Sequence, residues 1–149
     1  IVLFGFWNVR RNSKYYKEIA TGMHVPVHHQ RGEQLTCLPS RAGDDIEVNV
    51  SDIVYIEATQ NYLNVYLQQE GEVNRRMIRN TLKEIKSVLK EFPDIIQCHR
   101  SFLINMEYVE DVKGNSQGLV LHLDHTKTNT VPVSRTYVSV IRHKMESLV

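Results

Sequence analysis

The sequence predicts a mainly β protein with one short helix in mid-chain and a second helix at the C-terminal end. From residue 35 onward, short apolar runs alternate with turn-forming residues, which is typical of strands. Within residues 35–149, only residues 82–92 and 138–148 place their apolar side chains on one helical face. Strands do not alternate with long helices, so a doubly wound parallel sheet is disfavoured.

Residues 1–34 differ in residue pattern from the rest of the chain. An apolar run ends in Trp7 and is followed by Arg10 and Arg11, which is typical of the cytoplasmic end of a transmembrane helix. A short apolar segment packed on the domain is the alternative, and both interpretations stay open. We therefore expect a juxtamembrane-like segment and linker at residues 1–34, followed by one domain at residues 35–149. The first interpretation implies a cytoplasmic domain tethered to the inner face of the cell membrane.

The expected strands are short, and several show the period-two alternation of a half-buried sheet. In one of them Leu63, Val65 and Leu67 share a face, and the residues between them are polar or aromatic. The β runs are residues 35–38, 46–50, 53–58, 62–67, 73–79, 95–98, 102–104, 108–112, 119–123 and 130–133.

Each expected helix begins after a capping residue. Thr81 and Glu84 have the spacing of a capping box, in which each side chain bonds the backbone amide of the other residue. Pro93 is expected to end this first helix. Ser134 is expected to cap the closing helix.

The charge total is nearly neutral, with 18 Lys and Arg against 17 Asp and Glu and a net charge of +1. A basic surface for nucleic acid would therefore depend on how the charges are distributed. Cys37 and Cys98 form no C-x-x-C pair, and we expect two buried free thiols. His24, His28 and His29 lack a fourth ligand at a fixed spacing, so no metal site is predicted.

Sequence motifs of enzymes are missing. The sequence has neither a phosphate-binding glycine loop, nor a G-x-S-x-G elbow, nor an H-E-x-x-H helix. We therefore predict no catalytic residues and no cofactor.

Polar residues instead gather at three strand ends, in residues 57–62, 98–101 and 132–137. Asn pairs bidentately with adenine and Arg with guanine, and a Ser at a helix start suits a phosphate. Taken singly, ordinary roles fit each residue as well: Asn61 as a turn former, Arg100 as an ion-pair partner and Arg135 as a solvated helix start. As a set they form a candidate nucleic-acid surface.

Four segments in this order resemble the LytTR family of bacterial transcription regulators. They are Asp52–Ala58 with Asn61 and Tyr62, Thr81–Ile85, Cys98–Asn105 in the pattern H-R-S-[FY]-[LI]-[VI]-N, and Val131–Arg135 before the final helix. The resemblance covers residues 35–149 and implies an elongated domain of about ten mostly antiparallel strands with small helices. It also implies that the loops enter successive major grooves on one side of bent DNA.

By the same resemblance, Asn61, Arg100 and Arg135 occupy base-contacting positions, although the family varies at the position of Asn61. Tyr62, Ser101, Ser134 and Tyr137 are expected near the phosphate backbone. The predicted function is a sequence-specific transcription regulator that binds promoter repeats in double-stranded DNA as pairs of molecules. The alternative is a membrane-tethered sensory or scaffold module whose β domain binds protein, which the near-neutral charge favours slightly.

Overall fold

The computed structural model describes residues 34–116, 118–123 and 126–147. The interpretations placed on residues 1–11 and on His24, His28 and His29 lie outside these residues. The described chain forms two compact units. The first comprises residues 34–97 and 101–106, and the second comprises residues 98–100 and 107–147.

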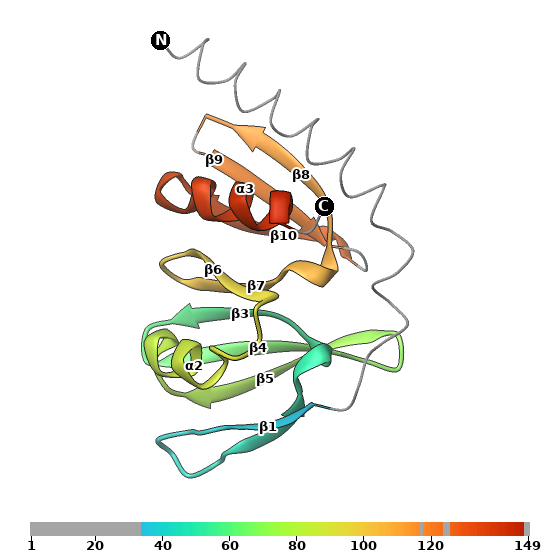
Figure 1. Ribbon diagram of the computed structural model, residues 1–149. Helices are drawn as coiled ribbons and strands as arrows, with labels where there is room; N and C mark the ends of the chain where they lie inside the picture. Colours follow the sequence, from blue (N-terminus) through green and yellow to red (C-terminus); the bar gives the residue numbers. More distant parts are fainter. Residues whose placement is uncertain (1–33, 117, 124–125, 148–149) are drawn as a thin grey trace. The chain divides into compact units, whose positions relative to one another are not determined.

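The first unit combines a two-stranded and a five-stranded sheet (Figure 1). The smaller sheet pairs β1 (Leu35–Leu38) with β2 (Ile46–Asn49) in antiparallel register. A 3-10 turn, η2 (Val50–Asp52), leads into the larger sheet, whose strand order is β5-β4-β3-β7-β6. Its strands are β3 (Ile53–Thr59), β4 (Tyr62–Gln69), β5 (Glu72–Arg79), β6 (Ile95–His99) and β7 (Phe102–Asn105).

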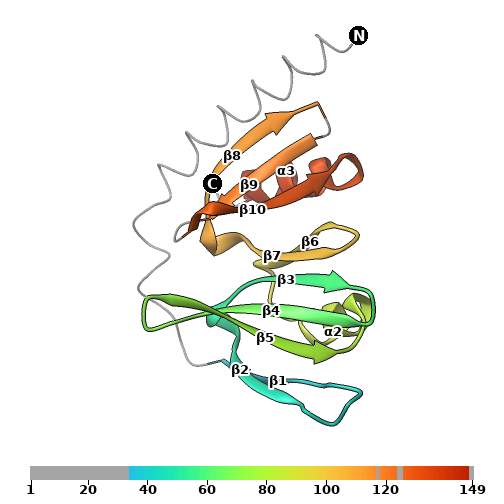
Figure 2. The ribbon, with the colours of Figure 1, turned by 180° about the vertical axis from the view of Figure 1, so that it is seen from behind.

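The helix α2 (Leu82–Val88) covers one face of the five-stranded sheet, and it lies behind that sheet in Figure 2. The predicted alternation along β4 is confirmed, because Leu63, Val65 and Leu67 are all buried in the core of this unit. Ile85 of α2 is fully buried in the same cluster. Burying one such aliphatic side chain contributes about 1.5–3 kcal/mol, so this apolar face holds α2 on the sheet.

The start of α2 agrees with the prediction in one of the two capping-box bonds, and the end of the helix comes earlier. The Thr81 N–H donates to the Asn80 side-chain oxygen at 2.7 Å rather than to Glu84, so the reciprocal bond of the capping box is not formed. Thr81 has an extended backbone, and its hydroxyl accepts the Glu84 N–H at 3.3 Å. The regular helix ends at Val88 rather than continuing through residue 92. The chain goes on in tight turns, in which the N–H of Phe92 donates to the Leu89 carbonyl at 3.0 Å. Leu89 and Phe92 therefore still pack on the core of this unit, although the regular helix has ended before them.

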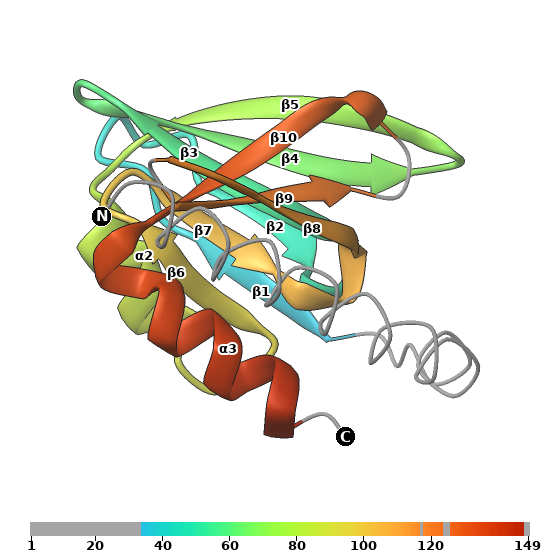
Figure 3. The same ribbon diagram turned by 90° about the horizontal axis from the view of Figure 1, so that it is seen from above.

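Besides the segment Cys98–Arg100, the second unit contains a three-stranded antiparallel sheet and a C-terminal helix. The strands are β8 (Val109–Asn115), β9 (Gly118–Leu123) and β10 (Thr126–Ser134), in the order β10-β9-β8. The helix α3 (Val138–Ser147) follows β10 through one 3-10 turn, η4 (Arg135–Tyr137), as Figure 3 shows from above. Its apolar side chains Ile141 and Met145 are buried.

The mainly β prediction is confirmed, with ten strands and two helices in the described chain. Two local predictions are wrong. Ser134 precedes η4 with an extended backbone but makes no side-chain cap, and α3 begins only at Val138. Both cysteines are free, yet Cys37 is exposed and only Cys98 is buried, because β1 turns its alternate side chains outward.

Candidate nucleic-acid interface

The β3–β4 turn of the first unit presents Asn61 and Tyr62 to solvent. It joins Thr59 to Tyr62, which are paired residues of the ladder, and Gln60 has a positive φ of 54°. The Asn64 side-chain amide donates to the Thr59 hydroxyl at 3.3 Å and so braces the base of the turn. Asn61 is exposed and Tyr62 is 43% exposed, so both side chains are accessible to a partner.

Ser101 lies at the same end of the five-stranded sheet as this turn. Its carbonyl accepts the N–H of Ala58 at 2.8 Å, which extends the β3–β7 ladder by one rung. Arg100 precedes it in the turn between β6 and β7 and is exposed. Within the described part of the chain, the Arg100 side chain has no ion pair. Its guanidinium is therefore a free cation at a strand end.

In the second unit, Arg135 is held by the β8–β9 turn. One guanidinium nitrogen, Nη2, donates to the Ser116 carbonyl at 2.7 Å. Ser134 is paired with Gly118 in the ladder, so the end of β10 lies beside this turn. Gly118 has a φ of +146°, and a Cβ there would lie 2.5 Å from the Val133 carbonyl oxygen. The close approach of the two strands therefore requires glycine.

The predicted contact residues fall into two groups in the structure. Asn61, Tyr62 and Ser101 share one end of the five-stranded sheet in the first unit. The second unit contains Ser134, Arg135 and Tyr137 and also includes the segment Cys98–Arg100. Arg135 is exposed, while Ser134 and Tyr137 are half-buried.

Sequence reasoning did not single out the arginines of β5 or the one in the turn before β2. Arg75, Arg76 and Arg79 are all exposed on β5, and Arg41 bonds the end of that strand. The period of two residues in a strand does indicate how these side chains are distributed. Arg75 and Arg79 lie on one face of β5, and Arg76 lies on the other. The contact with Arg41 joins residues distant in sequence, so no local pattern indicated it.

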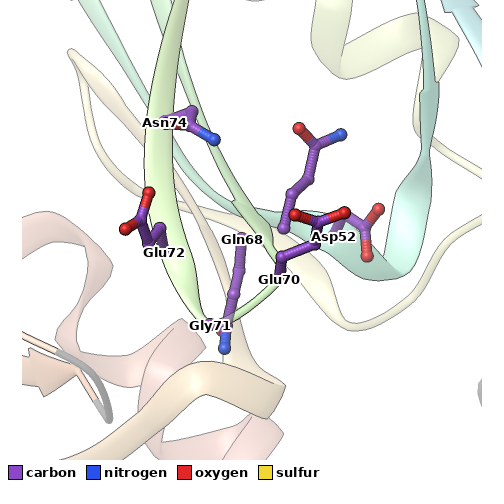
Figure 4. A pocket seen from close by; sticks show the side chains of 7 residues that line it. Asp52, Gln68, Glu70, Gly71, Glu72 and Asn74 are labelled. Carbon is purple, nitrogen blue, oxygen red and sulfur yellow. The ribbon is translucent and has the colours of Figure 1, made fainter.

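The opposite end of β4 and β5 is acidic. A polar pocket there is lined by Asp52, Gln68, Gln69, Glu70, Gly71, Glu72 and Asn74 (Figure 4). The lining contains three carboxylates and no cationic side chain. Such a surface repels phosphates, so this end of the sheet does not suit a nucleic acid.

The described residues offer no metal site, and their buried thiol, Cys98, is poorly reactive. No group of three or more His, Cys, Asp and Glu side chains is arranged for a metal among them. Burial raises the pKa of the Cys98 thiol to about 12, which leaves almost no thiolate at neutral pH. Burial, followed by the neighbouring Tyr66, raises the pKa of Tyr55. None of the helices described is long and apolar enough to cross a membrane.

Comparison with known proteins adds independent evidence. Residues 44–146 match the family model of the LytTr DNA-binding domain. The chain is 25% identical over 136 residues to the sensory transduction protein LytT of Bacillus subtilis, covering 90% of this chain and 53% of that protein. It is 27% identical over 100 residues to an uncharacterised response regulatory protein of Vibrio cholerae, covering 66% and 37% of the two chains.

A solved structure is similar as well. It is the LytTr DNA-binding domain of a Bacillus cereus response regulator, with a TM-score of 0.55 and 26% identity, covering 76% of this chain and 98% of that one. The chain thus spans about half or less of its curated relatives and nearly all of the solved domain. Because the family model covers most of the sequence, the chain belongs to the LytTr DNA-binding domain family.

Proposed function

We propose that this domain binds double-stranded DNA at specific promoter sequences and regulates transcription by reading base edges through exposed turn residues. The observation that carries the proposal is that Asn61, Arg100 and Arg135 are exposed at strand ends in a LytTr domain. Side chains at strand ends project past the sheet, so they reach into a groove that the flat sheet itself does not enter.

Each of the three residues suits a base edge by its chemistry. Among the residues that the structure describes, no partner bonds the Arg100 guanidinium, and Arg135 donates one N–H to the Ser116 carbonyl. A guanidinium forms two parallel hydrogen bonds with guanine O6 and N7, and the Asn61 amide can pair with adenine in the same manner. Ser101, Ser134, Tyr62 and Tyr137 carry hydroxyl groups that suit phosphate oxygens.

We further propose that the β3–β4 turn and the turn that carries Arg135 read successive major grooves of the DNA. Pairs of molecules then bind to promoter repeats.

We assign the domain to residues 35–149, of which residues 44–146 match the family. Residues 35–43 belong to it because β1 pairs with β2 along its full length. Limited proteolysis that trims the chain near residue 34, and leaves the rest intact, tests this boundary.

The test begins with a preferred duplex selected from a random library, and affinity is then measured by fluorescence anisotropy on that duplex and on random DNA. Arg100→Ala and Arg135→Ala are each expected to cost about 1–3 kcal/mol on the preferred duplex, which is roughly 5- to 150-fold in Kd. The loss on random DNA is expected to be much smaller, because phosphate contacts survive.

Lysine at either position provides the sharper comparison. Arg100→Lys and Arg135→Lys keep the charge but lose the planar fork, so specific binding should fall nearly as far as with alanine. Equal losses on both duplexes in folded protein would remove these arginines from base reading. If the domain instead binds a protein, its affinity for DNA will be negligible and its complex will respond little to salt.

A further inference from the structure

The end of β5 is bonded on its outer side by the turn that precedes β2. The Arg79 N–H donates to the Ser40 hydroxyl at 3.2 Å, and the Arg79 carbonyl accepts the Arg41 N–H at 2.8 Å. Both backbone groups of Arg79 therefore point away from β4. Tyr62, the ladder partner of Arg79 on β4, is consequently in a non-hydrogen-bonded pair with it. Side chains lie closest in pairs of this type.

Buried polar groups fix this arrangement. Ser40 is 9% exposed and Asn80 is 3% exposed. The Asn80 side-chain amide donates to the Pro39 carbonyl at 2.6 Å, and the Ser40 N–H donates to the Asp45 carboxylate at 2.7 Å. Because buried polar groups are costly unless they are hydrogen-bonded, the network selects one position for the turn. It places the backbones of Arg41, Arg79 and Tyr62 in a row across three chain segments.

The two arginines of this row are weakly compensated. Arg79 is exposed and has no ion pair in the part of the chain that the structure describes. Arg41 approaches the Glu84 carboxylate at 3.6 Å, with side chains 62% and 46% exposed. An exposed pair at this distance contributes little and is screened by salt. Two weakly compensated cations are therefore held on adjacent backbones at this end of β5, with the Arg41 guanidinium directed toward Glu84 of α2.

The row lies beside the β3–β4 turn, whose Asn61 immediately precedes Tyr62. Arg79 is consequently one ladder rung from the tip of the turn, about 3 Å along the strand. The major groove is about 8.5 Å deep, and phosphates line its edges. When the β3–β4 turn enters the groove, long side chains one rung behind the tip of the turn come close to these phosphates.

We propose that Arg41 and Arg79 form a second DNA-contact site, which binds backbone phosphates beside the β3–β4 turn. This site rests on the proposed function and deepens it, because it supplies affinity and register without reading sequence. The near-neutral chain thus gains a local cationic surface at the end of the sheet that carries Asn61.

The experiment measures Kd on the preferred duplex and on random DNA across a salt series, with Arg41→Gln, Arg79→Gln and the double variant. Each loss of a phosphate contact is expected to reduce the slope of log affinity against log salt by about 0.9, and both losses together by about 1.8. At 0.15 M salt this corresponds to roughly fivefold weaker binding for each single variant, alike on both duplexes.

Arg76→Gln is the matched control, because it removes the same charge from the same strand. Arg76 is paired with Val65 in the ladder and lies on the opposite face of β5 from Arg79. Its slope is expected to stay near that of the unmodified protein. Circular dichroism confirms that all variants remain folded, since the backbone bonds of Arg41 and Arg79 do not depend on their side chains.

Two results would overturn the proposal: unchanged slopes for Arg41→Gln and Arg79→Gln, or an equal reduction with Arg76→Gln. If Arg100→Ala still weakens binding to the preferred duplex more than binding to random DNA in that case, only the phosphate site fails and the proposed function stands. If the unmodified protein does not bind DNA at all, the proposed function fails and takes this site with it.

Discussion

Gly118 offers a test of how the structure holds Arg135. This residue begins β9 and is paired with Ser134, the last residue of β10. In Gly118→Ala the new methyl group would lie 2.5 Å from the Val133 carbonyl oxygen and 3.8 Å from the Arg135 amide nitrogen. The backbone at φ +146° also disfavours any L side chain.

The expected cost has two parts. An alanine in such a backbone conformation costs about 1–3 kcal/mol. An ordinary van der Waals contact for this methyl group begins near 3.4 Å, so the strand end must also move by about 0.9 Å to remove the overlap fully. Overpacking of this size costs about 1–3 kcal/mol more, which gives a total of about 2–6 kcal/mol.

Gly43→Ala separates these two parts. Gly43 also has a positive φ, of +88°, but a Cβ there would meet nothing within 4 Å. It is expected to show the backbone cost alone, so Gly118→Ala should be less stable than Gly43→Ala by at least about 1 kcal/mol. Urea unfolding followed by circular dichroism measures the free energy of unfolding for both variants.

The strand displacement also predicts a binding effect. Val133 is two residues before Arg135, so a shift of its carbonyl moves the guanidinium away from the Ser116 carbonyl. At a temperature where Gly118→Ala is still folded, it should weaken binding to the preferred duplex more than to random DNA. Equal stability of the two glycine variants, or unchanged DNA preference in Gly118→Ala, would refute this reasoning.

Further outcomes follow from other parts of the structure. Asn105→Ala should lower the free energy of unfolding in urea by about 1–3 kcal/mol, because the buried Ile53 carbonyl loses its 2.9 Å bond from the Asn105 amide; a change below 0.5 kcal/mol, as an order-of-magnitude threshold, would contradict this. Iodoacetamide at pH 8 should modify exposed Cys37 and spare Cys98, whose pKa is raised to about 12, and mass spectrometry after denaturation should show both modified. Lys86→Gln and Lys90→Gln should leave the salt slope for DNA unchanged; a reduction of about one for either would place α2 against phosphates.

Much of the fold was predictable because short-range patterns decide it. The alternation of Leu63, Val65 and Leu67 is fixed by the period of a strand, and the Thr81 cap by its spacing from Glu84. Ser134 failed as a cap because a 3-10 turn intervenes before α3, which begins only at Val138. The exposure of Cys37 depends in the same way on which face of β1 turns outward.

The candidate site was only partly accessible to sequence reasoning. Asn61, Arg100 and Arg135 were identified by resemblance to a family, whereas periodicity alone left each of them with an ordinary role. The bond between Arg135 and the Ser116 carbonyl requires the pairing of β9 with β10. Two hydrogen bonds join Arg79 to the turn that precedes β2, one from Arg41, 38 residues away in sequence, and one to Ser40, 39 residues away. Contacts over such a separation leave no local pattern in the sequence.

The small net charge is compatible with DNA binding because opposite charges are separated within the first unit. Asp52, Glu70 and Glu72 line the pocket at one end of the β4–β5 hairpin, and Arg41 and Arg79 lie at the other end. The eight residues of β4 separate these ends by about 23 Å. Electrostatic interactions are screened over about 8 Å at physiological salt, so a phosphate near the arginines scarcely senses the carboxylates. A charge sum over the whole chain therefore understates the attraction that the proposed DNA-facing end exerts on a phosphate.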